Sequence, residues 1–194
     1  MTMTLSQSRR GIHIFVVVSA ITFLAYSVSF GLVLPLERLA SGRPEIQAIV
    51  LFLPHGVKII AAWMLGWWSL PFMLPIVVLS DAVFEGVAPG PINLALCVLT
   101  LVTAPLAFDL FRLAGIDLGP QSGRRVPWRA LPLVGFVASV MNVIPIFFLE
   151  MESAAPRTVL FSMVSFVLGD TLGVIVALFV AMLAYRWWRR HGAF

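Results

Sequence analysis

Three charged side chains lie deep inside long apolar segments of the chain, where each of them needs a partner. Lys58 is about twelve residues into the second apolar segment, Asp81 about twelve into the third and Asp170 about thirteen into the sixth. A charge at the centre of a bilayer costs at least about 2.5–3.5 kcal/mol on insertion scales, so such side chains face the interior of a helix bundle. The matching depths predict that Lys58 meets Asp81 or Asp170 there.

Three further polar side chains extend this group. His55 is one helical turn from Lys58 on the same face, because residues i and i+3 of a helix are neighbours. Asn142 lies near the middle of the fifth segment, and Glu85 lies one turn outward from Asp81. The predicted central polar cluster, which is also the candidate ligand-binding site, consists of His55, Lys58, Asp81, Glu85, Asn142 and Asp170. Two interpretations stay open: a buried ion pair that fixes helix packing, or a site for a small ligand or an ion.

The second segment, "LFLPHGVKIIAAWMLGWW", also predicts a helix break beside this cluster. Pro54 removes an intrahelical hydrogen bond and Gly56 loosens the turn, so we expect a kink or break near mid-membrane. Such a break exposes helix-end amides and carbonyls, as in transporter binding sites, although proline kinks without function are also common. In the sixth segment, "LGDTLG" places Gly169 and Gly173 around Asp170, at a spacing that lets another helix approach closely.

The other reactive residues do not form a recognisable catalytic or metal site. His13, His55 and His191 are the only histidines and no two share a depth, which argues against a histidine-ligated haem or metal. The single cysteine, Cys97, excludes a disulfide framework. Phosphate-loop and HExxH motifs are missing from the sequence. We therefore expect a protein that is not an enzyme and that carries no cofactor and no metal.

The composition is typical of an integral membrane protein. Of the 194 residues, 60% are hydrophobic and 11% charged, whereas soluble domains have about 25% charged residues. Several apolar runs reach the roughly 20 residues that cross a bilayer, and lipid requires such runs to be helical. The "LERLASGRPEIQ" connection is compatible with a short interfacial helix. We predict one all-α domain over residues 1–194, a polytopic bundle of six transmembrane helices at about 11–34, 46–67, 69–87, 90–113, 130–149 and 157–187.

The arginines predict the orientation of this bundle, because cytoplasmic loops are enriched in basic residues. An N-in, C-in arrangement puts nine arginines inside and three outside, in a multi-pass protein of a bacterial inner membrane. The inner set is Arg9, Arg10, Arg112, Arg124, Arg125, Arg129, Arg186, Arg189 and Arg190, and the outer set is Arg38, Arg43 and Arg157. Because the basic residues flank apolar segments, we expect the lipid bilayer as partner and no nucleic acid.

Two stretches resemble the first type of bacterial membrane-associated sensor domain. "FLPHGVKIIAAWMLGW" is similar to that family's proline–x–glycine start followed by an apolar run and glycine, and "SFVLGDTLGVIVALFVAML" is similar to its "LGD-x-xG" helix. The resemblance implies a multi-helix sensory module of the kind that precedes a cyclase, phosphodiesterase or histidine kinase domain. It carries over Pro54, Gly56, Gly169, Asp170 and Gly173, but not His55 or Lys58. With no output domain after the sixth helix, the output is expected on another chain.

Three functions follow from these observations. The first is a sensor-type inner-membrane protein that binds a small ligand, an ion or a partner through the central polar cluster. The second is a substrate-binding subunit resembling those of energy-coupling-factor transporters, which are also six-helix proteins of about this size. The third is an accessory subunit of a larger membrane complex, in which the buried charges fix packing alone. A cavity near Glu85 open to the outer face favours transport, whereas a directly paired Lys58 without a cavity favours the accessory subunit.

Overall fold

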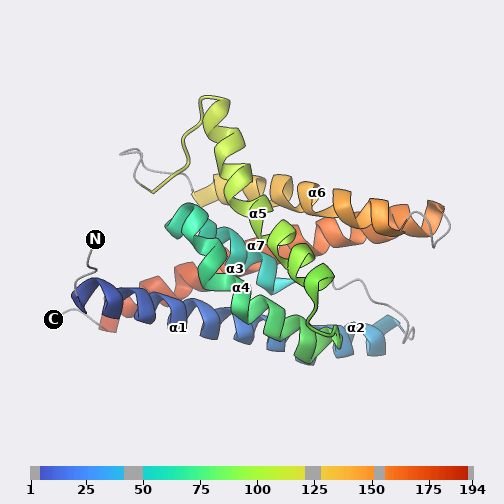
Figure 1. Ribbon diagram of the computed structural model, residues 1–194, viewed down its shortest axis with the longest axis horizontal. Helices are drawn as coiled ribbons and strands as arrows, with labels where there is room; N and C mark the ends of the chain where they lie inside the picture. Colours follow the sequence, from blue (N-terminus) through green and yellow to red (C-terminus); the bar gives the residue numbers. More distant parts are fainter. Residues whose placement is uncertain (1–4, 42–49, 121–127, 151–155, 192–194) are drawn as a thin grey trace.

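The computed structural model describes residues 5–41, 50–120, 128–150 and 156–191, and this part of the chain folds into helices without any strand. The helices lie against one another as a bundle, with long helices at its edges and shorter ones between them (Figure 1). In chain order they are α1 (Leu5–Val28), η1 (Ser29–Val33), α2 (Leu34–Ser41), α3 (Leu53–Leu65), η2 (Gly66–Trp68), α4 (Ser69–Ser80), η3 (Asp81–Glu85), α5 (Pro91–Leu113), η4 (Trp128–Ala130), α6 (Leu131–Glu150) and α7 (Pro156–His191).

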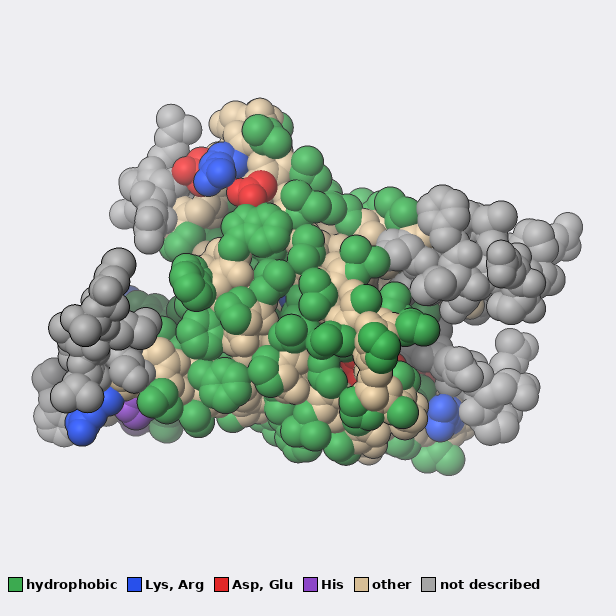
Figure 2. Space-filling view, viewed as in Figure 1, with side chains coloured by type: hydrophobic (Ala, Val, Ile, Leu, Met, Phe, Trp, Pro, Cys, Tyr) green, Lys and Arg blue, Asp and Glu red, His purple; other side chains and the backbone are tan. Residues whose placement is uncertain are grey.

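The all-α prediction is confirmed, and the protein has the helices of a membrane protein. In the described residues, four helical stretches are long and apolar enough to cross a bilayer: Arg9–Ala40, Leu53–Glu85, Pro91–Leu113 and Ser162–His191. Hydrophobic side chains cover the middle of the face in Figure 2, and most of the charged side chains visible on it lie near its edges. Lipid tails would cover such a surface, since no water is needed to solvate it.

The first predicted helix, 11–34, is longer in the structure. α1, η1 and α2 follow one another directly from Leu5 to Ser41, so the start of the connection predicted as a separate interfacial helix continues the first one. A π-helical turn, Ser29–Val33, interrupts the regular hydrogen bonding. Such turns are frequent at functional sites. Here the turn carries Ser29, a fully buried residue, whose hydroxyl binds the chain that leads into α3.

The predicted helix 46–67 differs most from the structure. Residues 46–49 lie outside the described part, Val50–Phe52 are not helical, and α3 begins only at Leu53. Pro54 therefore lies in the first turn, where proline's missing N–H disrupts no intrahelical bond. The prediction of a break within a continuous helix was wrong, because Pro54 and Gly56 begin a helix. Its 13 residues span about 20 Å, too short to cross a bilayer alone.

The start of α3 lies beside the middle of α7 and is held there by backbone hydrogen bonds. The Phe52 amide donates to the carbonyl of Gly169 at 3.1 Å. The Leu53 amide donates to the Ser29 hydroxyl oxygen at 3.1 Å, and that hydroxyl donates to the Leu51 carbonyl at 3.2 Å. Helix α3 thus begins inside the protein, and the residues that lead into it are hydrogen-bonded to Gly169 on one side and to Ser29 on the other.

A turn at Gly66 connects α3 to α4. Gly66 has φ 57° and ψ −135°, a conformation that is essentially restricted to glycine. In Figure 1, α3 runs towards one end of the bundle and α4 returns towards the other. The Ser69 hydroxyl donates to the Gly66 carbonyl at 2.7 Å and stabilises the turn. Because of this reversal, η3 lies near the end of the bundle where α2 also lies.

Glycines allow α3, α6 and α7 to pack closely. A Cβ added to Gly56 would lie 2.5 Å from the Cβ of Ala177 and 2.6 Å from the carbonyl oxygen of Gly173. A Cβ on Gly173 would collide with the carbonyl of Phe52, and one on Gly135 would lie 2.7 Å from Val174. Gly173 and its "LGDTLG" segment therefore form the close helix contact that the spacing predicted, with the start of α3 as the partner.

Candidate functional site

The first polar site joins α3, α6 and α7 around His55. The side chains of His55 and Asp170 are nearly inaccessible, with residue exposures of 1% and 3%. The Nε2 atom of His55 lies 3.1 Å from the carbonyl oxygen of Gly135 on α6, and its Nδ1 atom lies 3.3 Å from Oδ2 of Asp170 on α7. The Ser139 hydroxyl donates to the same Oδ2 at 2.7 Å. We call His55, Asp170, Ser139 and the Gly135 carbonyl the histidine–aspartate site.

Lys58 lies one turn further along α3, but it contacts α5 instead of a carboxylate. Its Nζ donates to the carbonyl oxygen of Thr100 at 2.9 Å, and the residue is 8% exposed. Among the described residues, no carboxylate lies within 4.0 Å of Lys58, since the ion pairs there are His55–Asp170 and Arg112–Asp109. The predicted direct pairing of Lys58 with Asp81 or Asp170 was therefore wrong. The backbone carbonyl is a neutral acceptor that satisfies one ammonium hydrogen.

Asp81 belongs to a second polar site, between α1, η3 and α5. Its Oδ1 accepts a hydrogen bond from the Tyr26 hydroxyl at 3.2 Å, and its Oδ2 accepts one from the Cys97 thiol at 3.1 Å. The Cys97 sulfur also lies 3.4 Å from Oδ1 of Asn93, one turn earlier on α5. Both carboxylate oxygens of Asp81 thus have a donor. We call Asp81, Tyr26, Cys97 and Asn93 the aspartate–tyrosine site.

The predicted single cluster is therefore divided between separate groups. Asn142, on α6, is half-buried, and its Oδ1 has no hydrogen-bond partner in the described part of the protein. No hydrogen bond joins it to either site there. Glu85 lies one turn beyond Asp81, as predicted, but its side chain lines a cavity. Depth along the segments was used to group these polar residues, but it did not predict which helix faces meet.

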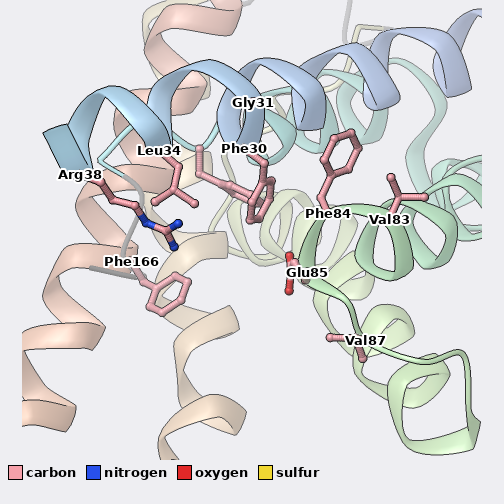
Figure 3. Close-up of a pocket in the computed structure, with 10 residues that line it drawn as sticks. Phe30, Gly31, Leu34, Arg38, Val83, Phe84, Glu85, Val87 and Phe166 are labelled. Atoms are coloured by element: carbon pink, nitrogen blue, oxygen red, sulfur yellow. The ribbon is translucent and has the colours of Figure 1, made fainter. Parts of the chain in front are cut away.

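The cavity near Glu85 has a volume of about 590 Å³, within the size range of small-molecule sites. It lies between the α1–α2 helix, η3 and α7, and Figure 3 shows the Glu85 carboxylate and the Arg38 guanidinium both directed into it. Its lining residues are Phe30, Gly31, Leu34, Arg38, Phe52, Val83, Phe84, Glu85, Val87 and Phe166. The lining is thus mostly apolar and aromatic, with two charged groups.

Aromatic rings form one wall of this cavity and connect it to the aspartate–tyrosine site. The rings of Phe30 and Phe84 stack with centroids 6.0 Å apart, and Phe52 meets Phe30 edge-on at 6.3 Å. Tyr26 stacks on Phe30 and on Phe84 at 6.0 and 6.2 Å. Its hydroxyl binds Asp81 directly behind the wall. Such aromatic faces can hold a flat or a cationic group.

Glu85 is the chemically distinctive residue of this cavity. Within the described part of the chain, its carboxylate makes no hydrogen bond and no ion pair within 4.0 Å. A carboxylate without a donor, directed into an aromatic cavity, is suited to bind a ligand's ammonium or other N–H or O–H donor. The described residues contain no group of three or more histidine, cysteine, aspartate or glutamate side chains that could hold a metal ion.

Sequence reasoning missed several residues of these sites. Tyr26 is a polar aromatic deep in the first apolar segment, and a buried tyrosine hydroxyl usually has a partner, so this signal was available. Ser139 lies one turn before Asn142 and could have been found by the same depth argument. The carbonyls of Gly135 and Thr100 carry no signal in the sequence.

Comparisons with protein-family models, with curated proteins and with solved structures return no match.

Proposed function

We propose that the protein is a non-enzymatic membrane receptor of the sensor-module type, which binds a small organic molecule in the cavity beside Glu85. The observation that carries this proposal is a carboxylate that accepts no hydrogen bond from the described residues and is directed into an aromatic cavity of about 590 Å³. The ligand has an apolar or aromatic body that fits against Phe30, Phe52 and Phe84, and an amine that reaches Glu85. The resemblance to sensor modules supports the receptor role.

The proposed topology is six passes through a bacterial inner membrane, with both ends of the chain inside. Two features support it: the first residues of α1 and the last residues of α7 lie at the same end of the bundle (Figure 1), and that end carries Arg9, Arg10 and the Arg186–Arg190 cluster. α3 completes the second pass together with Val50–Phe52, which precede it. In this orientation the cavity, near Arg38 at the end of α2, faces the outer side.

A transport subunit is the second candidate, and the position of the cavity favours it. An outward-facing cavity near Glu85 is suited to capture a substrate, and a helix that begins at mid-depth is a common feature of transporter sites. An accessory subunit is less well supported, since Lys58 binds a carbonyl and a cavity is present. Purification from native membranes, with identification of the bound subunits, distinguishes the two functions. A receptor should co-purify with an output protein, and a transport subunit should co-purify with an ATPase complex.

The ligand class is tested by thermal unfolding of the purified full chain in detergent, followed by tryptophan fluorescence. The probes are 2-phenylethylamine and its uncharged counterpart 2-phenylethanol. A ligand at 100 times its Kd stabilises the folded state by about 2.7 kcal/mol, which raises Tm by about 5–11 °C. We expect the amine to raise Tm and the alcohol to have much less effect.

Two variants and a matched control locate the effect. Glu85→Gln removes the charge and should abolish the preference for the amine. Gly31→Leu should fill the cavity without straining the fold, because a Cβ at Gly31 would have nothing within 4 Å. Asp109→Asn removes a carboxylate on α5 outside this cavity and should respond like wild type. A response to the amine that survives both Glu85→Gln and Gly31→Leu would show that it binds elsewhere.

A further inference from the structure

We propose that His55 and Asp170 together form one buried proton-binding site, whose proton holds the start of α3 against α6 and α7. The site uses none of the residues that line the cavity, so this inference is independent of the proposed receptor function. It assigns a ligand, a single proton, to the histidine–aspartate site. The atoms of this site that can donate a hydrogen bond, and those that can only accept one, determine where a proton is needed.

The ring of His55 has its orientation and one proton fixed by α6. Its Nε2 atom lies 3.1 Å from the carbonyl oxygen of Gly135, and a carbonyl oxygen can only accept. The proton of a neutral His55 ring therefore resides on Nε2. In that tautomer Nδ1 carries a lone pair and no hydrogen.

The other side of the ring then has two acceptors facing one another. Nδ1 of His55 lies 3.3 Å from Oδ2 of Asp170, and it is a buried atom with no hydrogen-bond partner in the described structure. The Ser139 hydroxyl cannot supply the missing hydrogen, because it already donates to Oδ2 at 2.7 Å. A neutral ring facing an ionised carboxylate would leave a buried lone pair against a negative charge. One additional proton, on Nδ1 or on Oδ2, removes this conflict.

The aspartate–tyrosine site provides a contrast within the same protein. Asp81 receives a donor on each carboxylate oxygen, from the Tyr26 hydroxyl and from the Cys97 thiol. It is therefore satisfied as a carboxylate and requires no extra proton. Asp170 accepts one hydrogen bond, from Ser139. Its Oδ2 also faces Nδ1 of His55.

Few other charges act on this site. On α3 the neighbouring charged group is Lys58, which interacts electrostatically with both His55 and Asp170 and donates to Thr100 of α5. From α6, no titratable side chain lies between Leu131 and Ile144; its contributions are Ser139 and the Gly135 carbonyl. From α7, Asp170 is the titratable group that faces His55. The positive charge of Lys58 balances the carboxylate, and the shared proton satisfies the hydrogen bond.

The proton makes the stability of the folded state change with pH in one direction. An unfolded chain releases its histidine protons above about pH 6.5, and under this proposal the folded site still holds one. The folded state then binds one proton more than the unfolded state, so stability falls as the pH rises. For one proton, the decrease in Tm is about 3–5 °C per pH unit. Loss of the proton weakens the contacts that hold α3 between α6 and α7.

Asp170→Asn tests the inference, because the amide replaces the proton permanently. In the place of Oδ2 its NH₂ can donate one hydrogen to Nδ1 of His55 and the other to the Ser139 hydroxyl oxygen. We expect Tm of purified wild-type protein to fall between about pH 6.5 and 8.5, and Asp170→Asn to lose about 3–5 °C per pH unit of that slope. Asp109→Asn, which removes a carboxylate on α5 outside both the cavity and the histidine–aspartate site, should keep the slope. The same slope in wild type and Asp170→Asn would overturn the proposal.

A measurement on the unmutated site decides the question should Asp170→Asn fail to fold. In His13→Gln/His191→Gln protein, His55 is the one remaining histidine. Nitrogen-15 NMR of the labelled ring at pH 7.5, with infrared detection of protonated carboxyl groups, counts the protons at the site. We expect a protonated Nε2 and, in addition, either a protonated Nδ1 or a protonated Asp170. A neutral ring beside an ionised Asp170 in folded protein would refute the inference.

Discussion

Gly173 offers a direct test of how α3 is attached to α7. In Gly173→Ala the new methyl group would collide with the backbone carbonyl of Phe52, which is not a flexible side-chain end that could move aside. The carbonyl is held in place, because the Phe52 amide donates to Gly169 and the next amide donates to Ser29. The substitution therefore has to move the start of α3 away from α7.

The expected cost combines two effects. Forcing an extra methyl group into a packed interior costs about 1–3 kcal/mol. Losing one backbone hydrogen bond costs a further amount of about 0.5–1.5 kcal/mol. For a chain of this length, 1 kcal/mol lowers Tm by about 2–4 °C, so Gly173→Ala should lower Tm by roughly 3–18 °C. Thermal unfolding in detergent, followed by tryptophan fluorescence, measures this change.

Gly11→Ala is the matched control. Gly11 lies in α1 and a Cβ there would have nothing within 4 Å, so the same chemical change meets no obstacle. Alanine also favours helix over glycine by about 1 kcal/mol, so Gly11→Ala should keep or slightly raise Tm. Equal Tm values for Gly173→Ala and Gly11→Ala would refute the close approach of Phe52 to α7, and with it the position of α3.

Two further predictions concern the aspartate–tyrosine site and the turn between α3 and α4. Tyr26→Phe removes one of the two donors to Asp81 and should cost about 1–3 kcal/mol, measured as a lower Tm; an unchanged Tm would contradict the hydrogen bond. Gly66→Ala forces a side chain into the conformation at φ 57° and ψ −135° and should cost about 1–3 kcal/mol, whereas Gly11→Ala should not. The denaturant midpoint of each purified variant provides the second measurement, and wild-type stability for Gly66→Ala would refute the turn.

Composition and apolar length were enough to predict an all-helical membrane protein, but not how each segment crosses the bundle. The second segment is apolar throughout, and hydropathy does not distinguish a full helix from a half helix preceded by extended chain. What decides it is the tertiary contact of Phe52 with Gly169, which lies more than a hundred residues later. The glycine spacing around Asp170 indicated a close contact there, but the identity of the partner depended on the fold.

The polar residues were identified from their depth along each apolar segment, and Lys58 was then assigned to the wrong partners. Depth follows from counting residues along a helix, whereas pairing depends on the rotation of each helix about its axis. Asp81 lies at the start of the π-helical turn η3 and faces Tyr26 and Cys97, which its depth could not indicate. His55 and Asp170 were both named as candidates, and the structure brings them together through an unpredicted glycine carbonyl and serine.

The seat of α3 has a consequence for the order of events during synthesis. The amide of Phe52 reaches its acceptor, Gly169, only after the ribosome has added all the residues between them. Until α7 enters the membrane, the stretch from Leu51 to Gly56 has no contacts with α7. Its exposed peptide groups then need another hydrogen-bond partner, in the lipid or at the translocon. The start of α3 therefore reaches its final position only after α7 has been made, although α3 is made much earlier.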